Sequence, residues 1–158
     1  MLKPVGLALI FTVCVYIGYE AAALSRRKLR MTEALISLLT YIKAQIEFFS
    51  APLNEIYDGF RNDTLDNCGF IDNLRQKGFT AALDTIRFSI TGEVYDSLTA
   101  FAAGLGKSGK QCQIDLCDYH IEMLRTVCVE LTASLPQKTR MYTSLSVMAG
   151  LTAVIILL

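Results

Sequence analysis

Hydrophobic residues in the middle of the chain recur every three or four positions, which is the period of one face of an α-helix. The first such run begins at Met31 and continues with Leu35, Leu38, Ile42, Ile46 and Phe49. The longest run comprises Ile114, Cys117, Ile121, Leu124, Cys128, Leu131 and Leu135. Its alternating spacings are typical of a long helix packed along the seam of a bundle. Leu124 lies in the middle of this run and is predicted to be a structural core residue.

Four shorter helical segments are predicted between these two runs. They cover residues 53–60, 70–78, 80–86 and 94–104. Residues 61–67 are polar and predict a loop, whereas Gly78 suits the positive φ of a residue that closes a helix. No strand-like alternation competes with the helical periods. The sequence therefore predicts an all-α body, a bundle of about six helices.

The break between the first two helices predicts a structural corner formed by Glu47, Pro52 and Leu53. Ser50 can cap the second helix, and Pro52 in its first turn fixes where that helix restarts. Leu53 is expected to tuck into the bundle. Glu47, one turn before the break, is placed to accept hydrogen bonds from the free amides of the next helix. Near the other end of the chain, Pro136 is expected to bend or end the last long helix.

Two long uncharged runs flank this body, at Pro4–Tyr19 and Met141–Leu158. They contribute to a composition with 53% hydrophobic residues, which is high for a soluble domain. At about 1.5 Å of rise per residue, the second run would reach roughly 27 Å as a helix, close to the thickness of a bilayer core. The sequence therefore predicts transmembrane helices over residues 4–24 and 141–158, which flank a helical body of residues 25–139.

Basic residues border both runs on the side of the body, and we call them the basic collars. They are Arg26, Arg27, Lys28, Arg30, Lys138 and Arg140. Residues 31–137 hold eight basic and fourteen acidic side chains, a net charge of −6. Because positive charge is retained on the cytoplasmic side, the collars predict a cytoplasmic body with both termini across the membrane. A signal peptide cleaved near residues 21–23 is the alternative for the first run, and the positive cluster after it argues against cleavage.

The charge of the whole chain bears on the choice of partner. With 15 basic and 15 acidic residues the formal net charge is zero, so the chain lacks the basic field that nucleic-acid binding requires. Nucleic acid is therefore not expected as a partner. The chain has five cysteines, and an odd number in a chain whose body is predicted to face the cytoplasm does not indicate a disulfide framework.

The sequence carries none of the common catalytic motifs. It has one histidine, no glycine-rich phosphate loop, no His-Glu-x-x-His and no Gly-x-Ser-x-Gly. Asp115, Asp118 and Glu122 share one face of the longest predicted helix, which makes them a candidate docking strip for a basic partner. Because Arg125 continues the same face, the pattern favours a solvated and partly neutralised stripe, and docking is its main functional interpretation. Neither an enzyme activity nor a cofactor is expected.

A second candidate site consists of Cys112, Cys117 and His120. Positions 117 and 120 share a helical face, and the spacing comes near that of metal ligands. A structural zinc ion normally requires four ligands, and no second cysteine or histidine pair is present. Cys117 and Cys128 also fall on the apolar stripe, where cysteine acts as a small hydrophobic residue. A membrane-tethered helical domain that is regulatory or that binds a metal or a thiol is kept as the alternative function.

Several short motifs, in a fixed order along almost the whole chain, point to a known family. They are Gly18-Tyr19-Glu20, Glu47 shortly before Pro52-Leu53, Leu105-Gly106, Gln113, and the tail that runs from Ala149-Gly150-Leu151 to Leu158. In order and spacing they resemble stage III sporulation protein AB of endospore-forming bacteria. The sequence departs from the family at Gly109, where the family usually has aspartate, and in having no tryptophan.

The resemblance implies a cytoplasmic domain similar to the six-helix F domain of type II secretion and type IV pilus platform proteins. It also implies membership of the channel complex between mother cell and forespore, in the mother-cell membrane around the forespore. The implied partners are a secretion-type ring ATPase, on the cytoplasmic side, and other proteins of the sporulation channel. The implied role is a platform for assembly and coupling without turnover of its own.

Overall fold

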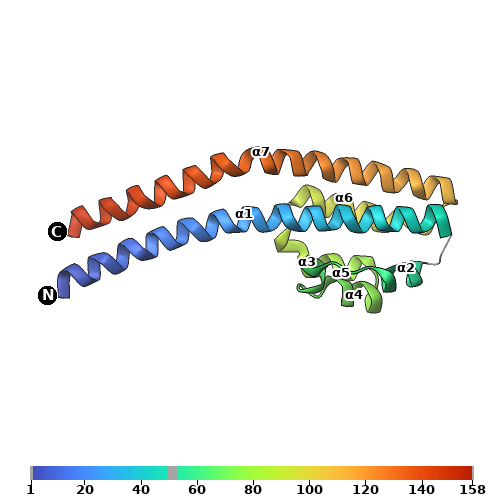
Figure 1. Cartoon of the computed structure of the whole chain (residues 1–158), viewed down its shortest axis with the longest axis horizontal. Helices are drawn as coiled ribbons and strands as arrows, with labels where there is room; N and C mark the ends of the chain where they lie inside the picture. Colours follow the sequence, from blue (N-terminus) through green and yellow to red (C-terminus); the bar gives the residue numbers. More distant parts are fainter. Residues whose placement is uncertain (1, 50–52, 158) are drawn as a thin grey trace. The chain divides into compact units, whose positions relative to one another are not determined.

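The computed structural model describes residues 2–49 and 53–157, and every element within them is helical (Figure 1). In chain order the long helix α1 comes first, a series of short helices follows, and the long helix α7 comes last. The elements are α1 Leu2–Phe49, α2 Leu53–Gly59, α3 Asp63–Asp66, α4 Phe70–Lys77, α5 Phe79–Ile86, the 3₁₀ helix η1 Arg87–Ser89, α6 Gly92–Gly104 and α7 Lys110–Leu157. The predicted all-α character is confirmed for the described residues.

The prediction of transmembrane helices over residues 4–24 and 141–158 is wrong. In the part of the chain that the structure describes, no helix combines the length and the apolar character that a membrane crossing requires. Thr143, Ser146 and Thr152 interrupt the C-terminal run, and each donates a hydrogen bond to a carbonyl of its own helix, at 2.8, 2.9 and 2.9 Å.

The two long helices extend well beyond the predicted limits. α1 and α7 each contain 48 residues, so the terminal runs and the stripes predicted for the body belong to the same two helices. Pro136 lies inside α7 and does not end it. Proline removes one backbone donor and crowds the preceding turn, yet the residues on both sides of it favour helix strongly enough for α7 to continue.

The chain divides into two compact units. One consists of the outer parts of α1 and α7, up to Arg27 and from Glu130. The other is the bundle, Lys28–Val129, which holds α2 to α6 together with the inner parts of the long helices. Within it α4 contacts α2, α3 and α5, and α5 contacts α6.

The two predicted stripes supply much of the bundle core. In α1 the residues Met31, Leu35, Leu38, Ile42 and Ile46 are buried, as are Cys117, Ile121 and Leu124 in α7. Leu124 is fully buried, which confirms its predicted burial. Since the stripe residues lie three or four positions apart, one side of each helix packs into the core and the other remains exposed.

An aromatic series crosses the core from α4 to α7. Phe70 meets Phe79 at a ring-centroid distance of 6.1 Å, Phe79 meets Phe101 at 5.4 Å, and Phe101 meets His120 at 5.5 Å. All three contacts are edge-to-face, an arrangement in which the positive ring edge faces the negative ring surface. The series ties four helices that are separate in the sequence.

The segment predicted as a loop at residues 61–67 contains the short helix α3. Asn62 caps it, because its side-chain oxygen accepts from the backbone N–H groups of Thr64 and Leu65, at 3.0 and 3.4 Å. The Asp66 carboxylate in turn accepts from the backbone N–H of Asn62 at 3.1 Å. This reciprocal pattern is similar to a capping box, with the acidic residue one position later than usual, and Leu65 is fully buried.

Arg75 joins α4 to the end of α2. Its Nε donates to the Tyr57 carbonyl at 3.3 Å, and its Nη2 donates to the carbonyls of Asp58 and Phe60, at 3.4 and 3.2 Å. The last carbonyls of a helix have no partner within the helix, so the guanidinium group satisfies acceptors that α2 cannot satisfy itself. Gly78 closes α4 with φ 85°, as predicted.

Candidate functional site

α7 presents one side to the core and the opposite side to solvent along residues 115–129. Cys117, His120, Ile121, Leu124 and Val127 are buried. The exposed side, which we call the α7 face, consists of Asp115, Asp118, Tyr119, Glu122, Met123, Arg125, Thr126 and Val129. The three predicted docking carboxylates therefore lie together on a surface that is available to a partner.

The three carboxylates differ in their partners. Asp118 forms an ion pair with Lys43 of α1, whose Nζ lies 2.6 and 2.8 Å from its two carboxylate oxygens. That hydrogen bond raises the pKa of Lys43. Asp115 accepts a hydrogen bond from the neutral side chain of Gln111 at 3.1 Å, and Glu122 is exposed. The charge of Asp118 is thus matched within the bundle, whereas the hydrogen bond of Asp115 is to a neutral group and Glu122 is exposed on the same helix as Arg125.

Lys43 was not a predicted site residue. It lies 75 positions before Asp118 in the sequence, and only the packing of α1 beside α7 in the bundle brings the two together. The sequence analysis also did not identify the exposed apolar residues of the α7 face, which are Tyr119, Met123 and Val129. Their helical spacing from Asp115 and Glu122 could have indicated that they are exposed. Arg125 is exposed on α7 as well, which agrees with a partly neutralised stripe.

Ser97 and His120 form a buried polar pair behind the α7 face. The Ser97 Oγ and the His120 Nδ1 lie 2.8 Å apart, and both residues are buried. Burial lowers the pKa of His120, because a charged imidazolium is disfavoured away from water. A serine next to a histidine can serve nucleophilic catalysis, but here the pair lies within the core between α6 and α7, where a hydrogen bond satisfies two buried polar groups.

The cysteines of the alternative site occupy different environments. Cys112 is exposed, whereas Cys117 and His120 are buried. Among the described residues, no group of three or more His, Cys, Asp or Glu side chains is arranged to hold a metal ion. Burial, with a smaller contribution from the neighbouring Asp118, raises the pKa of Cys117 to about 11. A thiol with such a pKa is almost entirely protonated at neutral pH and is a poor nucleophile and ligand.

The predicted corner is only partly described. Pro52, like Ser50, lies outside the described residues, and of Leu53 only its position at the start of α2 is described. The Glu47 side chain is exposed, and its backbone carbonyl accepts a hydrogen bond from the Lys110 Nζ at 2.7 Å. This bond joins the end of α1 to the start of α7. The structural role of the corner remains a prediction.

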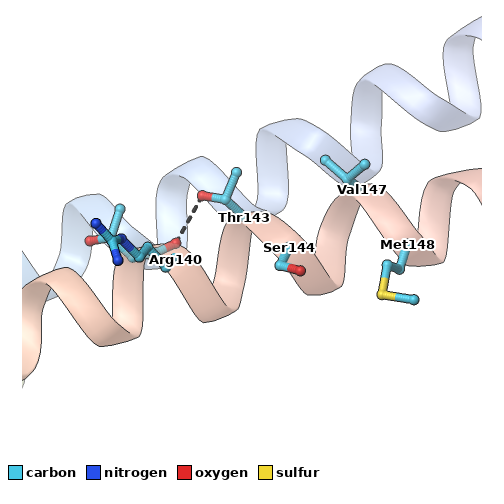
Figure 2. Close-up of a pocket in the computed structure, with 6 residues that line it drawn as sticks. Arg140, Thr143, Ser144, Val147 and Met148 are labelled. Atoms are coloured by element: carbon cyan, nitrogen blue, oxygen red, sulfur yellow. Dashed lines mark hydrogen bonds between the residues drawn. The ribbon is translucent and has the colours of Figure 1, made fainter.

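The basic collars are divided between the two units, with Lys28 and Arg30 in the bundle and the other four in the unit formed by residues 1–27 and 130–158. Arg26, Arg27, Arg30 and Arg140 are exposed, Lys28 is partly buried, and the side chain of Lys138 lies outside the described residues. Figure 2 shows Arg140 at an open groove along α7 that is also lined by Thr139, Thr143, Ser144, Val147 and Met148. The Thr143 hydroxyl there donates to the Thr139 carbonyl at 2.8 Å, as the dashed line in Figure 2 marks. The side chains that line this groove are hydroxyl, apolar and guanidinium groups, and none of them is a carboxylate.

Three comparisons with known proteins bear on the identity of the chain. No curated protein and no solved structure matches it. The family model of stage III sporulation protein AB, by contrast, matches residues 3–71 and 72–158, which is almost the entire sequence. That family is one of structural sporulation proteins and not of enzymes. The chain therefore belongs to the stage III sporulation protein AB family and has a role in stage III of sporulation.

Proposed function

We propose that the protein is a non-enzymatic assembly component of the sporulation channel between mother cell and forespore, and that the α7 face docks a basic surface of a ring ATPase. The observation that carries this proposal is the exposure of Asp115 and Glu122 on a helix whose opposite side is fixed in the bundle core. The family gives the stage of sporulation at which the protein acts.

The charge distribution supports docking at this surface. Residues 31–137 carry a net charge of −6 although the whole chain is neutral. An acidic surface attracts a basic partner over about 10 Å at ordinary ionic strength, and this attraction speeds the encounter more than it tightens the final complex. Components held side by side in one assembly need little affinity per contact, because shared attachment raises their effective concentration.

The proposed setting is the mother-cell side of the membrane around the forespore, with the bundle in the mother-cell cytoplasm. The all-helical bundle of short helices between α1 and α7 is compatible with a role like that of the secretion platform F domain. In this proposal the bundle couples the ATPase to the other channel proteins, and it performs no turnover of its own.

Charge reversal on the α7 face tests the proposal. A variant with Asp115→Lys, Asp118→Lys and Glu122→Lys should capture the ATPase from sporulating cells much less well at low salt. Its helix content, followed by circular dichroism, should stay unchanged because all three side chains are exposed. The double variant Asp115→Lys and Glu122→Lys leaves the Lys43 ion pair intact and should show most of the same loss.

A matched control reverses three other exposed carboxylates, Asp72 on α4 and Glu93 and Asp96 on α6. It changes the net charge of the chain by the same amount. Capture should persist in this variant if the position of the charges matters. Equal capture of the ATPase by the parent and the α7 variants at low salt would overturn docking at the α7 face. An equal loss of capture in the α7 triple variant and in the control triple variant would mean that only the total charge of the chain matters.

A further inference from the structure

The outer part of α7 carries a continuous stripe of exposed, uncharged side chains. Met141, Leu145 and Met148 follow one another at spacings of four and three residues, and Thr152 comes four residues later. At about 100° per residue, these four positions lie within roughly 60° of the helix circumference. All four residues are exposed. We call this series the outer stripe.

The surroundings of the outer stripe are uncharged as well. From Met141 to Thr152 the sequence holds no charged residue. The exposed residues that flank the stripe are Ser144, Ala149 and Leu151. Figure 2 shows Ser144 and Met148 on one side of α7, with Thr143 on the other. A partner that covers the outer stripe therefore does not have to remove water from a charge in this segment.

The spacing of the outer stripe is that of one helix packed along another. Alternating steps of four and three residues keep the side chains on the side that faces the neighbouring helix, where each inserts between residues of that neighbour. A second copy of this chain presents the same steps and the same side chains. Two uncharged sides meet without the repulsion between like charges, and methionine adapts its shape to fill gaps. The outer stripe is therefore complementary to itself.

The exposed area of this side of α7 is sufficient for a weak dimer. The exposed fractions are 48% for Met141, 58% for Leu145 and 64% for Met148. With Thr152 and the three flanking residues, the side offers on the order of 500 Å² per copy, so a pair buries about 1,000 Å². An interface of this area lies near the lower limit of specific interfaces and is typical of weak or transient pairs.

We infer that the protein forms a dimer in which the outer stripes of two copies pack against each other around a two-fold axis. In such a dimer both copies use the same surface. The inference goes beyond the proposed function and does not depend on it, because Asp115 and Glu122 lie in the other compact unit, Lys28–Val129. Copies gathered in one assembly need only weak mutual affinity, because shared attachment raises their effective concentration.

Sedimentation equilibrium of the full chain tests the dimer. Between about 1 and 100 µM the average mass of the parent should rise from that of one chain toward that of two. The variant Met141→Gln, Leu145→Gln and Met148→Gln should raise the dimer dissociation constant at least about tenfold, because burial of apolar side chains supplies the attraction. Glutamine has nearly the same helix propensity as methionine and leucine, so helix content should stay unchanged. A parent that remains monomeric throughout this range would overturn the inference.

The matched control carries Val13→Gln, Tyr16→Gln and Leu24→Gln. These α1 residues are exposed to a similar extent and belong to the same compact unit as the outer stripe, so the control removes a similar amount of exposed apolar surface. It should form dimers like the parent. An equal loss of dimer in both triple variants would mean that exposed apolar surface in general drives the association, and would overturn packing at the outer stripe.

Disulfide crosslinking locates the contact without the triple variants. Leu145→Cys, in the middle of the outer stripe, should form crosslinked dimers under mild oxidation. Thr143→Cys, at an exposed position on the other side of α7, should form no more of them than the parent with its native cysteines. Equal crosslinking through positions 145 and 143 would overturn the inference.

Two further measurements separate the dimer from other roles of this surface. Raising the salt concentration should not weaken the dimer, because the outer stripe carries no charge, whereas it should weaken ATPase capture at the α7 face. Phosphatidylcholine vesicles are the probe for a lipid surface. If the parent is monomeric and binds these vesicles while the glutamine variant of the stripe does not, a lipid surface covers the outer stripe and the dimer is wrong.

Discussion

At the scale of single residues, Arg75 is the side chain with the most demanding set of partners in the bundle. It bonds three backbone carbonyls around the end of α2 and lies 3.5 Å from the Asp58 carboxylate. Hydrogen bonds to a charged group are stronger than those between neutral groups, and a guanidinium presents donors in a fixed planar fork. The ammonium group of lysine cannot occupy all these positions.

Arg75→Ala should therefore lower the free energy of unfolding by about 1.5 to 3 kcal/mol, and Arg75→Lys should recover only a small part of this loss. Urea denaturation followed by circular dichroism measures both changes. Arg61→Ala is the matched control, because Arg61 is exposed, and its midpoint should stay close to that of the parent. A full recovery with lysine would show that charge and not the fork geometry holds the end of α2.

His120 makes stability depend on pH. Its folded-state pKa is lowered by burial from the ordinary value of 6.5, so between the two pKa values the unfolded chain binds more protons than the folded one. The stabilising effect of the neutral imidazole is fully present above pH 6.5 and is lost as the pH falls through the folded-state pKa. One proton gives a slope of at most about 1.4 kcal/mol per pH unit.

His120→Gln keeps a side chain that can hydrogen-bond Ser97 but removes the titration. Its free energy of unfolding should fall less steeply than that of the parent between pH 7 and pH 5, as measured by urea denaturation at several pH values. Parallel curves for the two proteins would mean that His120 titrates alike in the folded and unfolded states.

Residue-level partners were the least predictable feature. The sequence identified Asp115, Asp118 and Glu122 as one helical face, which their exposure agrees with. It could not identify Lys43 as the partner of Asp118 or Ser97 as the partner of His120, since each pair depends on the register of two helices that meet only in the folded bundle. Helical periodicity gives the face on which a residue lies but not what lies across from it.

At the scale of secondary-structure elements, α7 should contribute much of the stability of the bundle. Leu124→Ala removes a fully buried side chain and should lower the free energy of unfolding by about 2 to 5 kcal/mol, from lost transfer free energy and the cavity left behind. Thermal denaturation of the full chain measures the change. Met123→Ala, at the exposed neighbouring position, should melt close to the parent, and a similar loss in both variants would place the wrong side of α7 in the core.

The elements show which sequence signals are reliable. The apolar periods predicted the buried sides of α1 and α7 because burial of one stripe requires that spacing. The prediction of a loop at residues 61–67 was wrong because polar residues can cap a helix as well as form a turn. Here Asn62 and Asp66 hydrogen-bond to the backbone at the start of α3. Pro136 does not end α7, because a proline inside a long helix lowers its stability without preventing helical structure on both sides.

At the scale of the whole molecule, absence of charge was mistaken for membrane-spanning character. The uncharged terminal runs suggested transmembrane helices, whereas among the described residues no helix has the length and apolar character of a membrane span. The family resemblance was confirmed, since the family model matches almost the entire chain. A resemblance that extends over almost the whole chain depends less on the interpretation of any one segment than a prediction from a single uncharged run does.

Metal removal should leave the molecule unchanged. Cys112 is exposed while Cys117 and His120 are buried, so a bound ion is not expected to connect them. Dialysis against EDTA should therefore leave the thermal midpoint and the helix content of the full chain unaltered. Cys112→Ser, at the exposed position, should behave like the parent. A drop in midpoint that zinc reverses in the parent and not in Cys112→Ser would restore the metal-binding alternative.

The contact between Tyr119 and His120 also makes the molecule suitable for magnetic resonance. The chain has one histidine, and its ring lies edge-to-face between Phe101, at 5.5 Å, and the exposed Tyr119, at 5.1 Å. The ring currents of both neighbours shift the imidazole proton signals, so a single pair of resonances can be followed without isotope labelling. Their position reports the packing of α6 on α7 through Phe101, and a partner that moves the Tyr119 ring displaces the same signals.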